Sequence, residues 1–165
     1  MRTVVIVVLA LAALGSIRVF ADEPKPAEVK LAKLDLAAAG LPLTVDAPEG
    51  AKAEDFYGAV KVTKGDAFGF YVMNEGKDLA DLKKKFLAND SLKDKKVIKE
   101  SSDELVYEFI ISGFDVKVYY FHLNVKAGGK EYCISNQRSH INSTQNKQSV
   151  ELAMKCAKTL AAKSK

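Results

Sequence analysis

The sequence predicts an α+β fold in which one antiparallel β-sheet of six to seven strands has a helix packed on each face. The first observation is a meander at 104–135, three runs rich in β-branched and aromatic residues joined by short glycine-bearing connections. The second is that both faces of this meander are apolar and need cover. The third is a pair of amphipathic segments, 78–88 and 147–163, which can supply that cover. The expected element order is β-β-β-α-β-β-β-β-α, an α/β/α sandwich.

The N-terminus has the pattern of an export signal. Arg2 precedes an apolar run at 4–14, and Ala21 is a small residue at the expected cleavage point. A membrane anchor and an N-terminal core helix are the alternatives, but the run is shorter than the ~20 residues that a span requires. No cysteine lies near the cut, which argues against a lipid anchor. We expect a cleaved signal peptide at 1–21, a flexible tether at 22–30 and a single domain at 31–165, located in the periplasm or outside the cell.

Length and charge exclude some function classes. Removal of 21 residues from the 165 leaves 144, which suits one domain with its own core. The formal net charge is +4, and loss of Arg2 and Arg18 with the signal lowers it to +2. Nucleic-acid binding needs a concentrated basic face, so we expect no nucleic-acid partner. We expect a monomer that does not span a membrane once the signal is removed.

The strands before the first helix are read from alternation and turns. The stretch 31–39 is ambiguous, because it alternates like a strand but ends in three alanines. The stretch 41–47 alternates cleanly and closes at Pro48-Glu49-Gly50. The runs 59–63 and 68–73 form a hairpin across a short connection.

Two helices and one weaker strand complete the expected elements. In the segment 78–88, Leu79, Leu82 and Phe86 fall on one stripe. A weaker strand is expected at 95–100. The closing helix is expected to run from about 147 to 163, with a broad apolar stripe.

The turns of the meander give a register. A two-residue loop at Ser112-Gly113 places Phe109 opposite Val116 and Glu108 opposite Lys117. A turn at Ala127-Gly128 places His122 opposite Cys133. One face then holds Leu105, Tyr107, Phe109, Val116, Val118, Tyr120, His122 and Cys133. The other face holds Val106, Ile110, Tyr119, Phe121, Leu123, Tyr132 and Ile134.

The two cysteines predict a disulfide. Cys133 falls in a strand and Cys156 on the last helix, and export would place both in an oxidising compartment. A bridge would pin that helix to the sheet. The alternative is a tetrahedral zinc site that adds His122 and His140, but no C-x-x-C or H-x-x-x-H spacing supports it. We expect the disulfide and no metal.

No catalytic constellation stands out. The sequence has no G-x-S-x-G elbow, a bridged cysteine cannot act as a nucleophile, and Gly128-Gly129 has no helix after it to hold a phosphate. We therefore expect no catalytic residues and no cofactor.

Lysines form the densest positive region, in and after the first helix. A solvated helix face and a charged edge strand are the plain interpretation. The functional one is a weak platform for an anionic surface, an envelope component or an acidic partner protein. The residues are Lys83, Lys84, Lys85, Lys93, Lys95, Lys96 and Lys99.

The element order resembles that of the α/β/α sandwich shared by photosystem II extrinsic subunit P and the Mog family of Ran-binding proteins (PsbP/Mog-like). The parts that carry the resemblance are an early strand closed by a proline (43–48), the mid-chain helix, the long meander and the closing helix. Together they cover about 41–163. The resemblance implies a non-catalytic accessory or binding domain. The chain is also similar in character to small exported bacterial domains.

Three functions follow in order of preference. The first is a non-enzymatic accessory or binding module. The second is a carrier of a small apolar ligand, with a pocket between the sheet and a helix lined by Tyr107, Tyr120 and Met154. The third is a hydrolase, which would need polar groups converging in a cleft.

Overall fold

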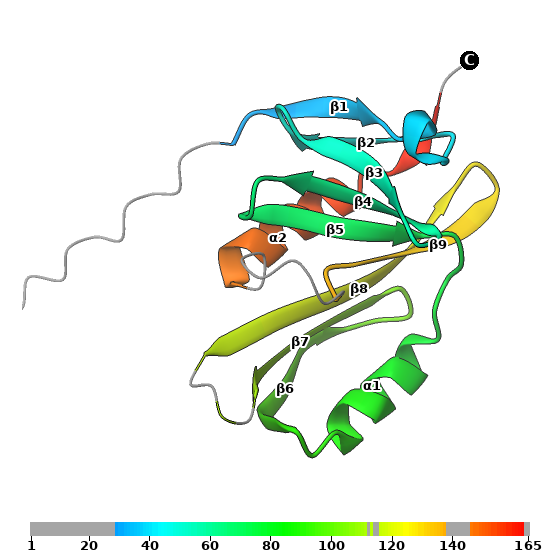
Figure 1. Ribbon diagram of the computed structural model, residues 1–165. Coiled ribbons are helices and arrows are strands. Elements are labelled where there is room, and N and C mark those ends of the chain that lie inside the picture. Colours follow the sequence, from blue (N-terminus) through cyan, green and yellow to red (C-terminus); the bar gives the residue numbers. More distant parts are fainter. Residues whose placement is uncertain (1–28, 112, 114–115, 138–145, 164–165) are drawn as a thin grey trace, which may run out of the picture.

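In the described part of the chain, strands outnumber helices and form two antiparallel sheets, with two α-helices packed beside them (Figure 1). The computed structural model describes residues 29–111, 113, 116–137 and 146–163. The strands are β1 (Leu31–Asp35), β2 (Leu43–Pro48), β3 (Lys52–Phe56), β4 (Ala59–Lys64), β5 (Phe68–Met73), β6 (Leu92–Glu100), β7 (Glu104–Ile111), β8 (Lys117–Ala127), β9 (Lys130–Ser135) and β10 (Ala161–Ala162). The helices are α1 (Leu79–Ala88) and α2 (Lys147–Ala157), with a 3-10 turn, η1, at Ala37–Ala39. The α+β class predicted from the sequence is confirmed.

The larger sheet has seven strands in the order β3-β4-β5-β9-β8-β7-β6. The meander predicted at 104–135 forms β7, β8 and β9, and β5 joins it through an antiparallel pairing with β9. Edge strand β6 carries two irregularities in its pairing with β7, and four lysines lie along it. Bulges and lysines on an edge both discourage pairing with another chain.

The smaller sheet, β1-β2-β10, corrects the expectation of a single sheet. The strand predicted at 41–47 is β2, but it pairs with β1 and β10 instead of joining the larger sheet. The ambiguous stretch 31–39 divides into β1 and η1. The predicted closing helix is shorter than expected: α2 ends at Ala157, and Ala161–Ala162 adds a short strand beside β2. In Figure 1 the small sheet and α1 lie at opposite ends of the molecule.

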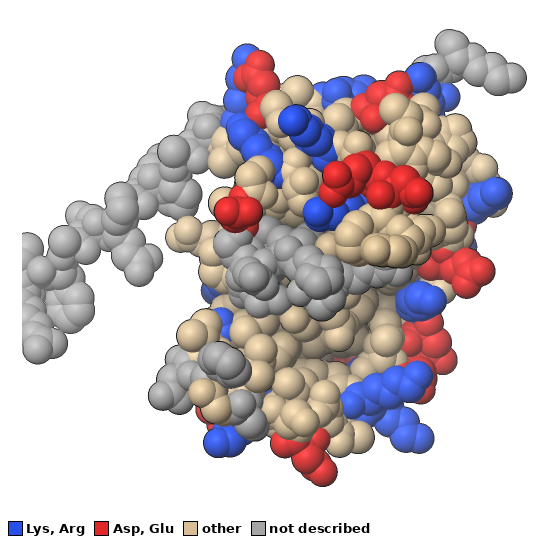
Figure 2. Space-filling view, in the orientation of Figure 1, with Lys and Arg blue, Asp and Glu red and all other residues tan. Residues whose placement is uncertain are grey.

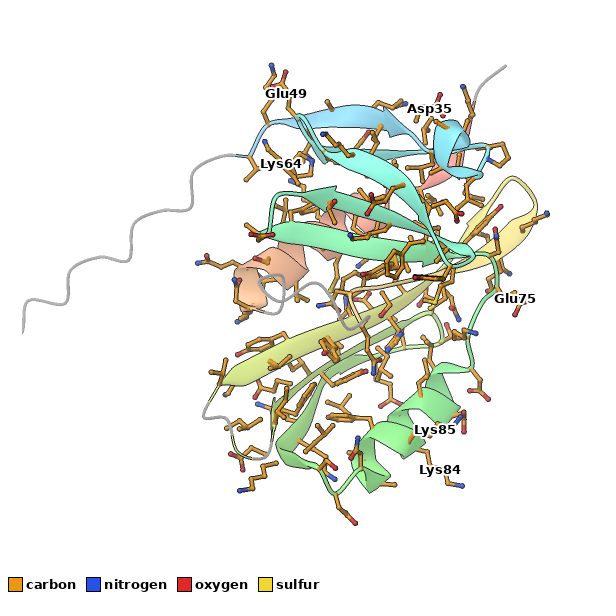
Figure 3. The ribbon with its side chains drawn as sticks, in the orientation of Figure 1. Asp35, Glu49, Lys64, Glu75, Lys84 and Lys85 are labelled. Carbon is orange, nitrogen blue, oxygen red and sulfur yellow. The ribbon has the colours of Figure 1, made fainter. Side chains whose placement is uncertain are left out.

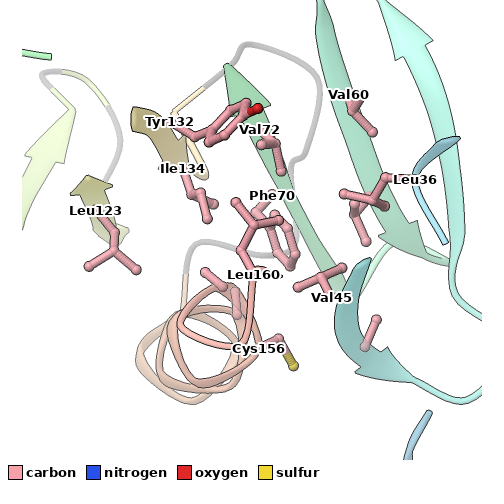
Figure 4. Packing of buried hydrophobic residues seen from close by; sticks show 14 of the residues in the cluster. Leu36, Val45, Val60, Phe70, Val72, Leu123, Tyr132, Ile134, Cys156 and Leu160 are labelled. Carbon is pink, nitrogen blue, oxygen red and sulfur yellow. The ribbon is translucent and has the colours of Figure 1, made fainter. Parts of the chain in front are cut away.

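The main hydrophobic core lies among α2, the small sheet and one set of side chains from the large sheet (Figure 4). From α2 it receives Val150, Ala153, Cys156 and Ala157. From the two sheets it receives, among others, Leu43, Val45, Val62, Phe70, Val72, Val106, Phe121, Leu123 and Ile134. Burial of each large side chain contributes about 1.5–3 kcal/mol, so this cluster dominates the stability of the fold.

A second, smaller core lies under α1. Leu79 and Phe86 of the helix pack against Leu105, Tyr107, Phe109 and Val118 of β7 and β8. The helix begins at Asp78, whose carboxylate accepts hydrogen bonds from the backbone N–H groups of Ala80 and Asp81. Such a cap satisfies amides that the first turn otherwise leaves unpaired. Tyr107 belongs to this core while its neighbour Val106 belongs to the first, as the alternation of side chains along a strand requires.

The register predicted for the meander is wrong by two residues. Phe109 lies opposite Val118, and His122 lies opposite Ser135, so His122 and Cys133 are not partners across β8 and β9. The turn after β8 uses Gly128-Gly129, both with positive φ, in place of Ala127-Gly128. A shift by two residues keeps every side chain on its own face. The described residues of each predicted face therefore stay together, and Lys117 still reaches Glu108 at 3.5 Å.

Two asparagine side chains extend the backbone hydrogen bonding. Asn136 is fully buried where β9 ends; its Oδ1 accepts from Phe121 N at 2.9 Å and its Nδ2 donates to Tyr119 O at 3.0 Å. The side-chain amide of Asn136 thus makes two hydrogen bonds to the backbone of β8, as a further residue of β9 would do. Asn124 makes the same pair of bonds with the backbone of Lys77, at the surface.

The predicted signal peptide (1–21) and most of the predicted tether (22–30) lie outside the described residues. No helix in the part of the chain that the structure describes is long and apolar enough to cross a membrane.

Candidate functional site

A cavity of about 380 Å³ lies beneath α1. The helix provides Leu82, Lys85 and Phe86, and the sheet provides Leu92, Tyr107, Phe109, Ile111 and Tyr120. Asn89, Ser91 and Gln137 complete its lining. The volume falls within the ~300–1,000 Å³ usual for small-molecule sites. The described residues therefore form a recess beside the second core.

Aromatic rings form most of the inner wall. The rings of Phe86 and Tyr107 lie 4.2 Å apart, and those of Phe109 and Tyr120 meet edge to face at 5.2 Å. Tyr107 also lies within 6.0 Å of Tyr120. Rings held in such contacts have restricted rotation, so the wall is preorganised for a flat apolar guest.

Three polar groups meet behind this wall. Tyr107 Oη donates to Gln137 Oε1 at 2.8 Å, and His122 Nε2 lies 2.7 Å from the same oxygen and 3.0 Å from Tyr107 Oη. Because Gln137 Oε1 can only accept, the network fits a neutral imidazole with its proton on Nε2. Within the described residues, His122 Nδ1 is buried with no hydrogen-bond partner. Gln137 lines the cavity, and its Nε2 group is a donor that can reach a guest there.

Burial keeps this network uncharged. It lowers the pKa of His122 to about 4, although the hydrogen bond to Gln137 acts in the opposite direction. Burial also raises the pKa of Tyr107 far above its ordinary value. Both groups are therefore neutral at pH 7. The inner end of the cavity offers hydrogen bonds but no charge.

At the mouth of the cavity, Lys85 is the one charged residue among the described residues of the lining. Its Nζ lies 2.7 Å from Asp81 Oδ2, one turn earlier on α1, and this hydrogen bond raises the pKa of Lys85. The pair is exposed and contributes little to stability. Asp81 thus offsets the charge of Lys85 at the entrance.

The structure places two of the three residues of the predicted apolar pocket in one cavity. Tyr107 and Tyr120 line the cavity together, but Met154 packs against the first core. It lines a separate hollow of about 440 Å³ beside α2, with Ile98, Glu104, Val106 and three lysines. Met154 lies apart from the two tyrosines because α2 packs on the face of the sheet that Val106 occupies. The side chains of Leu105 and Tyr107 point to the opposite face.

Glu104 is a buried carboxylate that the sequence did not single out. It is 6% exposed, and its two oxygens lie 2.9 Å from Lys99 Nζ and 3.0 Å from Lys158 Nζ. Burial alone would raise the pKa of Glu104, but hydrogen bonds from Lys99 and Lys158 outweigh it and hold the pKa below its usual value. Through these two ion pairs, Glu104 of β7 links β6 to the end of α2. The sequence signal was an acidic residue directly before the apolar run of β7.

The predicted disulfide is not formed: Cys133 and Cys156 are both free and buried. Cys156 lies in the first core, on the side of Val45 (Figure 4). Cys133 alternates with Ile134, which belongs to that same core, so its side chain points to the other face of the sheet. The sheet therefore separates the two sulfurs. Among the described residues no group of three metal-ligating side chains occurs, and His140 lies outside them.

Charge at the predicted lysine platform is compensated only in part. Lys83 contacts Glu100 at 2.6 Å, Lys99 contacts Glu104, and Lys95 donates to the carbonyl oxygens of Leu87 and Asn89 at the end of α1. Figure 3 labels Lys84 and Lys85 on α1, and Lys85 also lines the cavity beneath this helix. Figure 2 shows lysines interspersed with acidic residues over the visible face. Within the described residues, ion-pair partners are absent only for Lys84, Lys93, Lys95 and Lys96 of the seven.

The chain matches no protein family, no curated protein and no solved structure in the comparisons made with them.

Proposed function

We propose that the protein is a non-enzymatic binding module that takes up a small, mainly apolar and uncharged molecule in the cavity beneath α1, without a cofactor. The guest would place a flat apolar part against Phe86 and Tyr107. It would offer one acceptor, such as a carbonyl oxygen, to Gln137 Nε2. The expected export signal and tether make the periplasm or the extracellular space the proposed place of action.

The observation that carries the proposal is a partly open pocket of about 380 Å³ lined by aromatic and aliphatic side chains. A preorganised aromatic wall with a neutral donor behind it is the usual composition of a small-molecule site.

The proposed layering is α1 on one face of the large sheet and α2 with the small sheet on the other, as in a PsbP/Mog-like sandwich. In this arrangement the α2 side forms the rigid core, and the α1 side is covered by a single helix. Ligand entry would then require only a small displacement of α1.

The test uses N-phenyl-1-naphthylamine, an uncharged apolar probe whose fluorescence rises when it leaves water. The chain contains no tryptophan, so a tryptophan introduced by mutation is the only one present. Leu82→Trp fills the cavity from α1, and Leu152→Trp places the same side chain at a half-buried position on α2 that packs against the other core. Circular dichroism confirms that both variants fold.

We expect saturable binding to the wild-type protein and to Leu152→Trp, and at least a tenfold loss with Leu82→Trp. The proposal is wrong if wild-type protein shows no saturable binding, or if both tryptophan variants bind as well as the wild type.

A second candidate function is an accessory domain that docks on an anionic partner or envelope surface. It is favoured by Lys93 and Lys96 on edge strand β6, which have no ion-pair partner in the described part of the chain. Binding to vesicles containing phosphatidylglycerol should weaken with added salt and be lost in Lys93→Glu/Lys96→Glu. Binding that is insensitive to salt would exclude this function.

A further inference from the structure

Tyr57 has a backbone conformation that its side chain disfavours. It forms the turn between β3 and β4 together with Gly58, and the two residues have φ values of 49° and 77°. Two-residue hairpin turns with positive φ at both positions are usually Asn-Gly, Asp-Gly or Gly-Gly. A bulky residue at the first position is an outlier, and outliers of this kind concentrate at functional sites.

Packing does not explain the choice of tyrosine. Tyr57 is 88% exposed, the most exposed large hydrophobic side chain in the part of the chain that the structure describes. Its ring meets Phe56 edge to face at 4.9 Å, which leaves its remaining surface open to solvent. The side chain therefore stabilises neither the turn nor the core to a degree that would offset its conformational cost.

A hollow of about 380 Å³ lies at the base of the same turn. It is bounded by Gly58 and Ala59 of the hairpin and by the segment 38–41, which begins within η1. Most of these residues are alanine or glycine, so a ligand can approach the backbone closely. Asp55 and Asn74 line it as well, and their side chains make no ion pair with another described residue.

We propose that Tyr57 and this hollow form a carbohydrate-binding site for one pyranose unit of a glycan. The electron-rich face of an exposed tyrosine attracts the polarised C–H groups on one face of a sugar ring. The Asp55 carboxylate accepts hydrogen bonds from sugar hydroxyls, and the Asn74 amide both donates and accepts. This combination differs from the cavity beneath α1, whose described lining is mainly apolar and includes four aromatic residues. The two sites are independent.

The test is titration of the full chain, labelled with ¹⁵N, with cellotetraose and with chitotetraose. We expect millimolar or tighter binding of at least one tetrasaccharide, with amide shifts concentrated at 55–60 and 38–41. Tyr57→Ala should weaken binding at least tenfold, and Tyr57→Trp should retain it. Val116→Ala removes a different exposed apolar side chain and should have no effect.

The variant Tyr57→Asn distinguishes a role of Tyr57 in sugar binding from a role in the stability of the turn. Asparagine is favoured in such a turn, so this variant should unfold at the same or a higher temperature than the wild type while binding is lost. The proposal is overturned if neither tetrasaccharide shifts these amides at millimolar concentration, if Tyr57→Asn binds as the wild type does, or if the hollow binds tetramethylammonium in preference to either sugar. Leu82→Trp should leave sugar binding intact, so failure of this site is distinguishable from failure of the cavity beneath α1.

Discussion

Cys133 and Cys156 point to opposite faces of the seven-stranded sheet, although each is fully buried. The backbone of β9 and its neighbours lies between the two sulfurs. A disulfide needs its Cβ atoms about 4 Å apart and directed at one another, which this arrangement forbids.

Both thiols should therefore be free and unreactive in the native protein. Burial raises the pKa of each to about 11, so little thiolate is present at pH 8. We expect slow labelling by a thiol reagent in buffer and labelling of two groups in guanidinium chloride. A reductant should leave the melting temperature unchanged. An unreduced mass lower by two hydrogens would contradict the structure.

Loss of Lys158 should lower the free energy of unfolding more than loss of a lysine whose ion pair is exposed. Lys158→Met leaves the buried Glu104 with Lys99 as its one remaining cation and should cost about 2 kcal/mol of unfolding free energy. This is less than the ~3–5 kcal/mol of an isolated buried pair because Lys99 still compensates. The control is Lys163→Met, since Lys163 pairs with the half-exposed Asp35 and its loss should go undetected in urea denaturation. Equal losses of unfolding free energy in the two variants would show that the burial of Glu104 does not determine how much its ion pair contributes.

His122 should make the protein less stable in mild acid. Its pKa is about 4 when folded, against 6.5 for the free side chain, so the unfolded chain binds a proton that the folded chain does not. The contribution is complete above pH 6.5 and is lost as the pH falls toward 4. It amounts to about 3 kcal/mol at ~1.4 kcal/mol per pKa unit. Urea denaturation at several pH values should show a shallower loss for His122→Gln than for the wild type. Identical slopes in this window would contradict the assignment.

Asn136 and Asn124 make matched pairs of backbone hydrogen bonds in different surroundings. Asn136→Ala leaves the buried N–H of Phe121 and the C=O of Tyr119 without these partners, and we expect a loss of about 2–4 kcal/mol. Asn124→Ala exposes the corresponding groups of Lys77 to water and should cost about 1 kcal/mol. Chemical denaturation of both variants measures the difference. A smaller loss for Asn136→Ala than for Asn124→Ala would contradict the role of Asn136 in the sheet.

The sequence was sufficient to assign which side chains of the meander share a face, because alternation depends only on residue parity. It was not sufficient for the register, since Ala127-Gly128 and Gly128-Gly129 are both plausible turns. It also missed β3, because Tyr57-Gly58 lacks the Asn, Asp or Gly that usually marks a hairpin. The helix predicted to 163 ends early since Ala161 and Ala162 gain more from pairing with β2 than from helix propensity.

The candidate site was only half visible in the sequence. Tyr107 and Tyr120 stood out as aromatic residues on one face of the predicted sheet. Gln137 did not, because it follows the last strand and reaches His122 only through the fold. Met154 was grouped with these tyrosines for a similar reason, because the sequence pattern does not show which helix covers which face of the sheet.

The small sheet brings together segments from early and late in the sequence. Strand β2 pairs on one side with its neighbour β1 and on the other side with β10, near the C-terminus. A nascent chain that ends before Ala161 therefore leaves one edge of β2 open until synthesis is nearly complete. Contacts between residues far apart in sequence form late and slowly. We expect chains truncated at Leu160 to refold more slowly and to aggregate more readily through that open edge than the full-length protein.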